Sequence, residues 1–460
     1  MIALHTYRDK TLAVVGLGGS GKAVLAAAIA GGARVQAWDD AADRCTPMDG
    51  VTYLPPSAMA WDEIDTLVLA PGIPLTHPVP HPVVRLAHDH QVEVIGDVEL
   101  FLRQCPDQTI IAITGTNGKS TTTALTGHVL AEAGFDVRVA GNIGRPILSI
   151  DPPADKTVMV LELSSYQIDL TPSLAPHVAV LLNITPDHLD RHGGMDGYVS
   201  TKSMVFAQQR PGSLAILGQG DQHCRSLTDQ IIGRQNGPSV CPLNVDKAAD
   251  FGIYALQGRI FDNGLVGADI SEVMSLRGSH NHQNAAAAYA IARALNVPAA
   301  SIENGMKSFP GLAHRMEQVA TVNGVTFIND SKATNPDAAA RALASYDRIY
   351  WLAGGKPKDA GLDPVFPYLD HVVAGFYFGE AAPGLDGTLA ALVNGTQCAT
   401  LHQATEMAWQ MAVQDDHDAV ILLSPACASF DQFDNFEARG DAFRRAVYDV
   451  AGIPVTGGSA

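Results

Sequence analysis

The sequence of 460 residues has no run of about 18 apolar residues, the length that a membrane-spanning helix needs. It begins in a predicted strand, without the basic stretch and apolar run of a secretory leader. Its six cysteines are scattered and include no C-x-x-C pair, which excludes a disulfide framework and a structural zinc site. We therefore expect a cytoplasmic protein with no membrane partner. The cysteines are Cys45, Cys105, Cys224, Cys241, Cys398 and Cys427.

Basic residues are also scarce. Lys and Arg total 30 against 48 Asp and Glu, which gives a net charge of −18. Such a field repels nucleic acid backbones and anionic membrane surfaces over most of the exterior, so neither is an expected partner. An anionic substrate would have to be held by a few local cations and by backbone N–H groups.

The composition is that of an ordinary globular protein, with 47% hydrophobic and 17% charged residues. At roughly 150 residues per domain, the length predicts about three domains. Short β-branched runs alternate with Ala-rich helical stretches, which indicates α/β domains with parallel sheets. The expected domains are an N-terminal Rossmann-like domain at 1–97, a central P-loop mononucleotide-binding domain at 98–311 and a C-terminal Rossmann-like domain at 312–460. The predicted strands are 11–15, 33–38, 66–69, 109–114, 158–163, 178–184, 325–328, 349–353, 372–378 and 419–423, with helices at 22–30 and 284–295.

The most specific motif is Thr114-Gly-Thr-Asn-Gly-Lys-Ser120, which follows an apolar strand and opens a helix. Its glycines let consecutive N–H groups face phosphate oxygens, Lys119 would neutralise phosphate charge, and the Ser120 hydroxyl would bind Mg²⁺. Ile113 stands where the general G-x-x-x-x-G-K-[ST] pattern has its first glycine. A chance turn is the alternative, but strand, glycines, lysine and helix coincide as a phosphate loop requires.

A second glycine-rich turn, Gly16-Leu-Gly-Gly-Ser-Gly21, also joins a strand to a helix, and Asp39 closes the next strand. A dinucleotide site carries a ribose-binding acid at this place. The motif alone is weak, and a tight turn with no ligand is the competing interpretation. It indicates an anion site and leaves the identity of the anion open.

Several polar residues stand at predicted strand ends, where open α/β sheets bind ligands. Glu162 is a candidate Mg²⁺ ligand, although a capping or salt-bridge role is commoner for a single acid. His188 follows the next apolar run, and a structural histidine is the alternative. By composition alone, Lys202 is a solvated surface lysine. Asp330 and Lys332 lie in a polar turn before a Pro-initiated helix, which is either an anion site or an ordinary capped turn.

Together these segments resemble the Mur ligases, peptide-forming enzymes of bacterial cell-wall precursor synthesis, over nearly the whole chain. The 114–120 turn is similar to their shared ATP loop, including the isoleucine at 113. Residues 329–335 and 423–433, together with the Gly16 turn, are similar to the members that add D-glutamate to UDP-N-acetylmuramoyl-L-alanine. The resemblance implies an ATP-dependent ligase that uses two Mg²⁺ ions and acts on those two substrates.

The resemblance also implies roles for individual residues. The catalytic residues would be Lys119, Glu162, His188 and Lys202, with Lys202 carbamylated. The metal ligands would be Ser120, Glu162, His188 and Lys202. The nucleotide would contact Gly115, Thr116, Asn117, Gly118, Lys119, Ser120, Thr121, Asn284, Arg315 and Asp330. The other two substrates would contact Ser20, Asp39, Gly72, Asn142, Gln167, Lys332, Thr334, Lys358, Ser429 and Phe436.

The implied mechanism is attack of the substrate carboxylate on the γ-phosphate, giving an acyl phosphate from which the amine of D-glutamate displaces phosphate. Because nucleotide contacts come from the second and third domains, we expect the third domain to close on the site. We also expect a monomer. The alternatives are another Mur or folylpolyglutamate-type ligase, an NAD-dependent oxidoreductase built on the Gly16 turn, and a catalytically silent nucleotide-binding relative.

Overall fold

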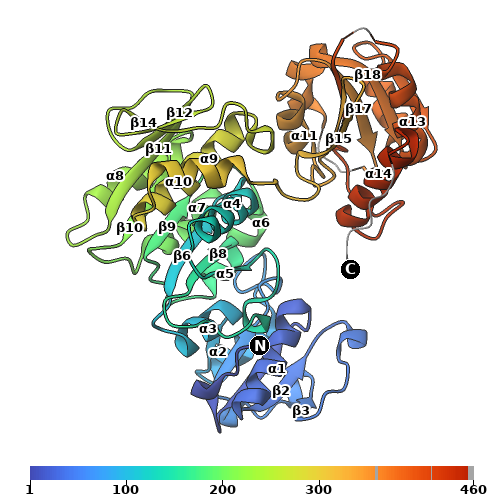
Figure 1. Ribbon diagram of the computed structural model, residues 1–460. Helices are drawn as coiled ribbons and strands as arrows, with labels where there is room; N and C mark the ends of the chain where they lie inside the picture. Colours follow the sequence, from blue (N-terminus) through green and yellow to red (C-terminus); the bar gives the residue numbers. More distant parts are fainter. Residues whose placement is uncertain (358–360, 416, 454–460) are drawn as a thin grey trace. The chain divides into compact units, whose positions relative to one another are not determined.

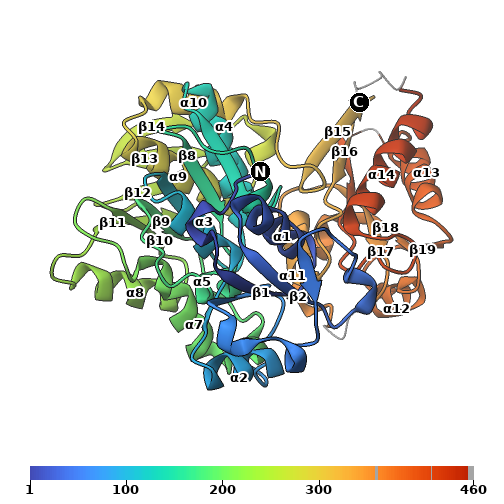
Figure 2. The ribbon, with the colours of Figure 1, turned by 90° about the horizontal axis from the view of Figure 1, so that it is seen from below.

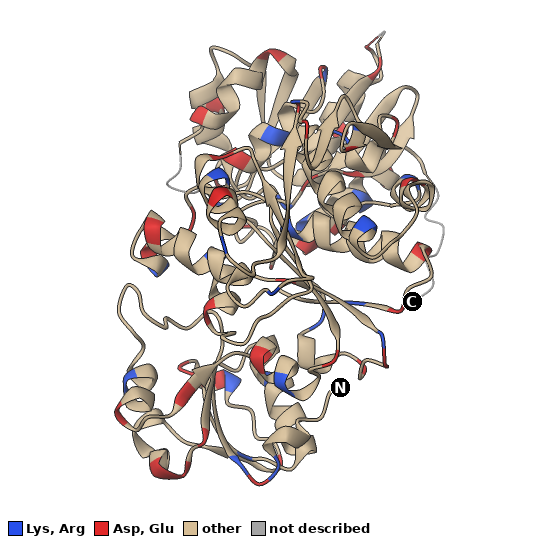
Figure 3. Cartoon of the chain, turned by 90° about the vertical axis from the view of Figure 1, so that its left-hand side faces the viewer, with Lys and Arg blue, Asp and Glu red and all other residues tan. Residues whose placement is uncertain are grey.

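The computed structural model describes residues 1–357, 361–415 and 417–453 (Figure 1). The chain forms two compact units. Unit 1 comprises residues 1–271 and 281–309, and unit 2 comprises residues 272–280 and those from 310 onward. Acidic positions are spread over the helices and loops of both units (Figure 3). Within the described ranges, no helix is long and apolar enough to cross a membrane.

The first sheet of unit 1 is wholly parallel, with strand order β3-β2-β1-β4-β5. Its central strand, β1, is buried along its whole length because a parallel sheet is covered on both faces. The strands are β1 (Thr11–Val15), β2 (Arg34–Trp38), β3 (Val51–Tyr53), β4 (Thr66–Leu69) and β5 (Glu93–Ile95). The helices are α1 (Gly19–Gly31), α2 (Pro82–Asp89) and α3 (Asp97–Gln104).

The second sheet of unit 1 has the strand order β14-β13-β12-β11-β10-β9-β6-β8-β7. Strands β6 to β12 form parallel pairs, whereas β12, β13 and β14 are antiparallel. The strands are β6 (Thr109–Thr114), β7 (Val137–Gly141), β8 (Val158–Glu162), β9 (Val178–Leu181), β10 (Leu214–Gly218), β11 (Ser239–Val245), β12 (Ile253–Leu256), β13 (Arg259–Asp262) and β14 (Leu265–Asp269). The helices are α4 (Lys119–Glu132), α5 (Ser165–Asp169), α6 (Leu189–His192), α7 (Met195–Ser203), α8 (Gln222–Ile232), α9 (Ser279–Ala294) and α10 (Ala299–Lys307).

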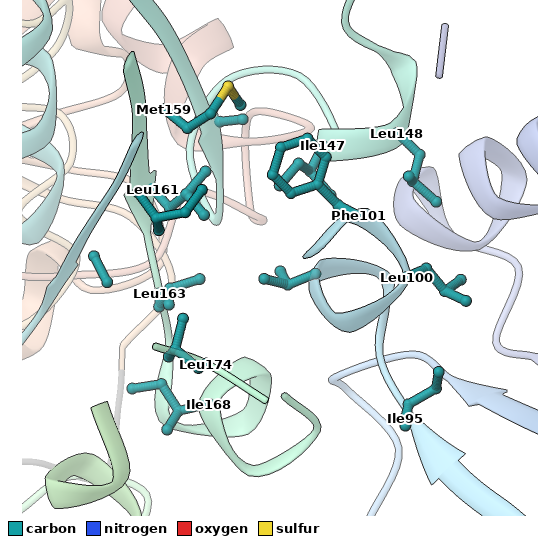
Figure 4. Packing of buried hydrophobic residues seen from close by; sticks show 14 of the residues in the cluster. Ile95, Leu100, Phe101, Ile147, Leu148, Met159, Leu161, Leu163, Ile168 and Leu174 are labelled. Carbon is teal, nitrogen blue, oxygen red and sulfur yellow. The ribbon is translucent and has the colours of Figure 1, made fainter. Parts of the chain in front are cut away.

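The two sheets of unit 1 share one continuous hydrophobic core. Helix α3 begins at the predicted boundary between the first two domains, and its Leu100 and Phe101 are fully buried. Figure 4 shows Phe101 beside Ile147, which belongs to the segment between β7 and β8. Full burial of such a side chain contributes roughly 1.5–3 kcal/mol, so these contacts hold the two sheets together.

Unit 2 contains one sheet with strand order β15-β16-β20-β17-β18-β19, parallel except for β15. Alternate residues of β17 enter two separate hydrophobic clusters, so both faces of the sheet are covered. One cluster includes α11 and α12, and the other includes α13 and α14 (Figure 2). The strands are β15 (Glu317–Val322), β16 (Val325–Asn329), β17 (Ile349–Gly354), β18 (Val372–Phe378), β19 (Gly395–Cys398) and β20 (Ala419–Leu423). The helices are α11 (Pro336–Leu343), α12 (Ala382–Leu389), α13 (Leu401–Ala412) and α14 (Phe436–Val450).

The predicted α/β class is confirmed, and every predicted strand overlaps an observed one. The run at 178–184 ends as a strand at Leu181, and the predicted helix at 284–295 begins earlier, at Ser279. The sequence analysis missed the antiparallel strands β12 to β15. Two-residue turns with positive φ at both positions join β12 to β13 at 257–258, β13 to β14 at 263–264 and β15 to β16 at 323–324. Each ends in glycine, and two are Asn-Gly, the strongest short-range signal for a hairpin.

Candidate functional site

The glycine-rich turn after β6 leads directly into α4. Gly115 and Gly118 have φ of +152° and +86°, a region that favours glycine. A Cβ at Gly118 would collide with Oδ1 of Asn284. The carbonyl of Asn183, just beyond β9, accepts the N–H of Thr116 at 2.9 Å. The turn is therefore shaped by its own glycines and by a neighbouring strand end, with the N-terminus of α4 as a site for an anion.

Lys119 and Ser120 begin α4. The Lys119 Nζ donates hydrogen bonds to the carbonyls of Gly115 at 3.0 Å and Thr116 at 2.9 Å, so the amine lies over the turn. Ser120 is buried, and Thr121 is half-buried. A cation and the positive end of a helix thus occupy the same place, which favours binding of a phosphate group.

Glu162 ends β8 and is buried, at 1% exposure. Its Oε1 accepts a hydrogen bond from Asn142 Nδ2 at 2.8 Å, whereas its Oε2 has no hydrogen-bond partner among the described residues. Strands β7 and β8 can lie this close together because residue 141 is glycine. A Cβ at that position would collide with the Glu162 carbonyl. A buried carboxylate oxygen without a partner is costly, and a bound cation would satisfy it.

Lys202 lies on α7 and is buried, at 1% exposure, which overturns the surface role that composition indicates. Its Nζ donates to the Gly115 carbonyl at 3.0 Å and lies 4.8 Å from the centre of the Tyr198 ring. None of the ion pairs found within the described ranges involves it. Burial, and then the nearby Lys119 charge, lower the pKa of Lys202 to about 7.

His188 has φ of +51°, and its Nε2 lies 3.5 Å from Asp187 Oδ2. Its side chain is more than half exposed. His192, which the sequence analysis missed, is buried and stacks on Tyr166, with ring centres 5.4 Å apart. Burial, with a smaller effect of the Lys202 charge, lowers the pKa of His192 to about 4. His192 is therefore neutral at pH 7, and its Nε2 shares a hydrogen bond of 2.9 Å with Ser165 Oγ.

In the first sheet, Asp39 supports the Gly16 turn itself. Its Oδ2 accepts the N–H of Leu17 at 2.6 Å and its Oδ1 accepts that of Ala41 at 2.9 Å. Gly16 has φ of +93°, and a Cβ there would collide with Ala70. The carboxylate thus satisfies one backbone donor in the Gly16 turn and one in the segment after β2, a structural role that does not require a ribose.

The other predicted residues on the UDP side are also in unit 1. The Gly72 carbonyl accepts a hydrogen bond from Arg191 Nη1 at 3.0 Å, which ties this loop to the segment after His188. Gln167 is buried and forms a capping box with Ser164 at the start of α5. Ser20, on α1, is hydrogen-bonded to the buried Asp97.

In unit 2, most of the predicted residues follow the neighbouring strands β16 and β20. Asp330, after β16, is buried, and its Oδ2 accepts a hydrogen bond from Ser424 Oγ at 3.1 Å. Burial raises the pKa of Asp330 to about 7. Lys332 places its Nζ 4.0 Å from the centre of the Phe436 ring. Three predicted residues remain in this unit. Arg315 lies near Asp330, and Thr334 is half-buried. Ser429 follows β20 and is buried.

Lys358 lies outside the described residues. Asn284 belongs to unit 1, where its Oδ1 accepts a hydrogen bond from Thr122 Oγ1 at 3.1 Å. No group of three or more His, Cys, Asp or Glu side chains that could hold a metal ion occurs in the part of the chain that the structure describes. A metal ion in unit 1 would depend on Glu162, on neutral ligands and on the phosphates of a nucleotide.

Two family models match the chain. The Mur ligase middle domain matches residues 113–292, and the Mur ligase glutamate ligase domain matches residues 314–427. A protein of Caulobacter vibrioides named UDP-N-acetylmuramoylalanine–D-glutamate ligase is 47% identical over 100% of this chain and 99% of its own length. A protein of the same name from Chelativorans is 46% identical over 99% of both chains.

Solved structures agree with the fold. The MurC ligase of Thermotoga maritima has a TM-score of 0.58 at 17% identity, covering 95% of this chain and 99% of its own. The MurF ligase of the same organism, in complex with ADP, has a TM-score of 0.58 at 14% identity, covering 98% and 99%. At these identities the likeness concerns the three-domain architecture.

Proposed function

Because the chain belongs to the Mur ligase family of ATP-dependent, amide-bond-forming ligases, we propose that it joins D-glutamate to UDP-N-acetylmuramoyl-L-alanine. The observation that carries this proposal is the 47% identity to a ligase of that name over the full length. The reaction would release ADP and phosphate, and it belongs to peptidoglycan precursor synthesis in the cytoplasm, which dividing cells need. We also propose that the protein acts as a monomer.

The glycine-rich turn at residues 114–120, called the phosphate turn from here on, supports the ATP half of this reaction. Lys119 and the N-terminus of α4 would bind the ATP phosphates and neutralise charge as the γ-phosphoryl group moves to the substrate carboxylate. The product of that step would be an acyl phosphate, from which the amine of D-glutamate displaces phosphate. Asn284, Arg315 and Asp330 would contact the rest of the nucleotide.

A magnesium ion fits the residues beside this turn. Glu162 has a buried oxygen without a partner, and Ser120 begins the adjoining helix. Mg²⁺ commonly binds through one or two carboxylates together with substrate phosphates, so this small ligand set is sufficient. When bound, the ion would offset negative charge on the phosphoryl oxygens. His188 and Lys202 would hold the second of the two proposed ions.

For that purpose we propose that Lys202 is carbamylated. The ammonium group would first lose a proton, and the free amine would attack the carbon of CO₂. An N–C bond forms as one C=O π bond opens onto oxygen, and a second proton leaves the nitrogen, so that a cation becomes an anionic oxygen ligand. The buried position and lowered pKa of Lys202 support this step, because a neutral amine is the reactive form. A ¹³C NMR carbamate signal after equilibration with ¹³CO₂, absent in Lys202→Met, is the expected result. Identical spectra for the two proteins would contradict it.

The predicted domain roles follow from these assignments. Residues 1–97 would bind the UDP portion, 98–311 would bind ATP, and 312–460 would bind the amino acid. On the UDP side the proposed contacts are Ser20, Asp39, Gly72, Asn142 and Gln167. On the amino-acid side they are Lys332, Thr334, Lys358, Ser429 and Phe436.

The test is phosphate release by the purified chain with ATP, Mg²⁺ and UDP-N-acetylmuramoyl-L-alanine. D-glutamate, L-glutamate, L-lysine and no amino acid are compared in parallel, with Lys119→Ala as the inactive control. We expect turnover with D-glutamate alone. Turnover with L-lysine instead would assign the chain to another branch of the family. A signal from nicotinamide cofactor binding without any ATP turnover would favour the oxidoreductase alternative.

A further inference from the structure

Arg439 is a completely buried arginine on the first turn of α14, with 0% exposure. The positive end of the helix macrodipole lies there, which disfavours a cation. The helix is capped instead by Asn435, whose side chain accepts the N–H of Ala438 at 2.7 Å. Arg439 is therefore buried at a position where helix stability gives no reason for a positive charge.

The guanidinium binds only neutral acceptors. Its Nε donates to Ser331 Oγ at 3.0 Å and its Nη2 to the Ser331 carbonyl at 2.8 Å. Its Nη1 faces the carbonyls of Gly354 at 3.2 Å, Cys427 at 3.1 Å and Ala428 at 3.2 Å. Within the described ranges no carboxylate is hydrogen-bonded to it, and the nearby Asp431 carboxylate acts on it through charge alone.

These acceptors come from three loops that follow neighbouring strands. Ser331 follows β16, Gly354 ends β17, and the 427–428 segment follows β20. Two of the loops contact each other directly, since the Lys356 N–H donates to the Ala428 carbonyl at 2.8 Å. The third contacts the start of α14, where Ser331 Oγ donates to the Phe436 carbonyl at 2.8 Å. Arg439 is the side chain that touches all three loops at once.

Two of these loops, and helix α14 itself, carry residues proposed for the amino-acid substrate. Lys332 follows Ser331 directly, Ser429 follows the 427–428 segment directly, and Phe436 begins the helix that carries Arg439. Gly355 leaves space for the guanidinium, because a Cβ there would lie 2.9 Å from Arg439 Nη1. The planar fork of an arginine, with five donors, is the side chain that can bind so many diverging carbonyls.

We infer that Arg439 is the positioning residue of the amino-acid subsite, holding its three loops in register and supplying a buried positive charge that favours a dianionic substrate. The inference rests on the proposed function, since it concerns the same subsite. A stabilising role alone does not account for the arrangement, because a buried cation with no acid hydrogen-bonded to it costs more than a packed apolar side chain of similar size.

The experiment is steady-state kinetics on the full chain with three variants and a control. Arg439→Met removes the charge and every hydrogen bond, Arg439→Lys keeps the charge without the fork, and Ser331→Ala removes one acceptor. The control is Arg445→Met, an exposed arginine on the same helix. For Arg439→Met we expect the KM for D-glutamate to rise about tenfold or more, with the KM values for ATP and the UDP substrate within about twofold.

Arg439→Lys is expected to lie between Arg439→Met and the wild type, and Arg445→Met to match the wild type. Equal KM values for D-glutamate in the wild type, Arg439→Met and Ser331→Ala would overturn the inference, as would a parallel rise of all three KM values. If Arg439→Met shows no cooperative thermal unfolding, the KM values of Arg439→Lys and Ser331→Ala for D-glutamate are compared with that of the wild type instead. Values equal to that of the wild type would overturn the inference. No turnover of D-glutamate by the wild type would overturn the proposed function as well, so the two failures are distinguishable.

Discussion

Lys202 in unit 1 and Arg439 in unit 2 are both fully buried cations that bind neutral acceptors, yet their surroundings differ. Lys202 has two oxygen acceptors and the face of Tyr198, and burial brings its pKa to about 7. Arg439 binds four backbone carbonyls and a hydroxyl, and its pKa falls only to about 10. At neutral pH the first is partly uncharged, whereas the second keeps its charge.

The difference shows how a buried cation with no acid hydrogen-bonded to it can serve two purposes. A lysine amine that loses its proton becomes a nucleophile, which suits a residue proposed for carbamylation beside the phosphate turn. An arginine stays protonated in proteins and holds several carbonyls in a fixed plane, which suits an anion-binding subsite. Unit 1 is accordingly the region where chemistry is expected, and unit 2 the region where the second substrate is bound.

The largest effect is expected at Lys202. Lys202→Arg keeps a positive charge but removes the amine that reacts with CO₂, so kcat/KM for phosphate release should fall about a thousandfold. Lys247→Arg, at an exposed position in unit 1, is the matched control and should be neutral. If Lys202→Arg kept wild-type activity, the contrast between a reactive lysine and a fixed arginine would be lost.

A smaller loss is expected at Glu162. Glu162→Gln removes the carboxylate that would hold Mg²⁺, so activity should fall roughly a hundredfold at saturating Mg²⁺. The thermal unfolding midpoint should stay level or rise, because the variant no longer buries a carboxylate with an oxygen lacking a partner. Glu132→Gln, exposed at the end of α4, is the control. A marked drop of the midpoint would mean that Glu162 is mainly structural.

The pH dependence of stability should differ in sign between the units. The folded-state pKa of Lys202 lies below its ordinary 10.5, so its contribution to stability rises as the pH rises from about 7 to 10.5. The folded-state pKa of Asp330 lies above its ordinary 3.8. Its contribution to stability is therefore full below pH 3.8 and is lost as the pH rises to about 7.

The free energy of unfolding changes with pH by up to roughly 1.4 kcal/mol per pH unit when the folded and unfolded states differ by one bound proton. Urea unfolding of the wild type, Lys202→Met and Asp330→Asn between pH 4 and 10 measures both slopes by difference. Lys202→Met should be relatively stabilised below pH 8, and Asp330→Asn relatively stabilised above pH 6. Parallel curves for all three proteins would show that neither group changes its pKa on folding.

The smallest effect is expected at the helix cap beside Arg439. Asn435→Ala removes the side-chain acceptor for the Ala438 N–H and should reduce the free energy of unfolding by about 1 kcal/mol. Because α14 carries Phe436 and Arg439, the KM for D-glutamate should also rise about threefold. Thr400→Ala, which uncaps α13 in the same unit, should give a similar loss of stability with no change in KM. Equal KM values for the two variants would argue against α14 as the positioning helix.

The local elements were predictable because their signals lie within short stretches of sequence. The predicted strands and the glycine-rich turns depend on β-branched runs and on glycine at positive φ, and both are visible in the sequence. The hairpins of β12 to β14 were missed although Gln257-Gly258 and Asn263-Gly264 mark them. The resemblance to a ligase family rested on several such stretches, which is why it covered nearly the whole chain.

The sequence by itself thus determined the α/β class, the phosphate turn and the identity of the residues around it. Only the tertiary structure decided which of those residues are buried and which partners they have. It made Lys202 an interior amine, left an oxygen of Glu162 without a partner, and gathered three loops around Arg439. The reason is physical: desolvation and hydrogen-bond satisfaction depend on atoms from segments far apart in the chain, which no local pattern of residues specifies.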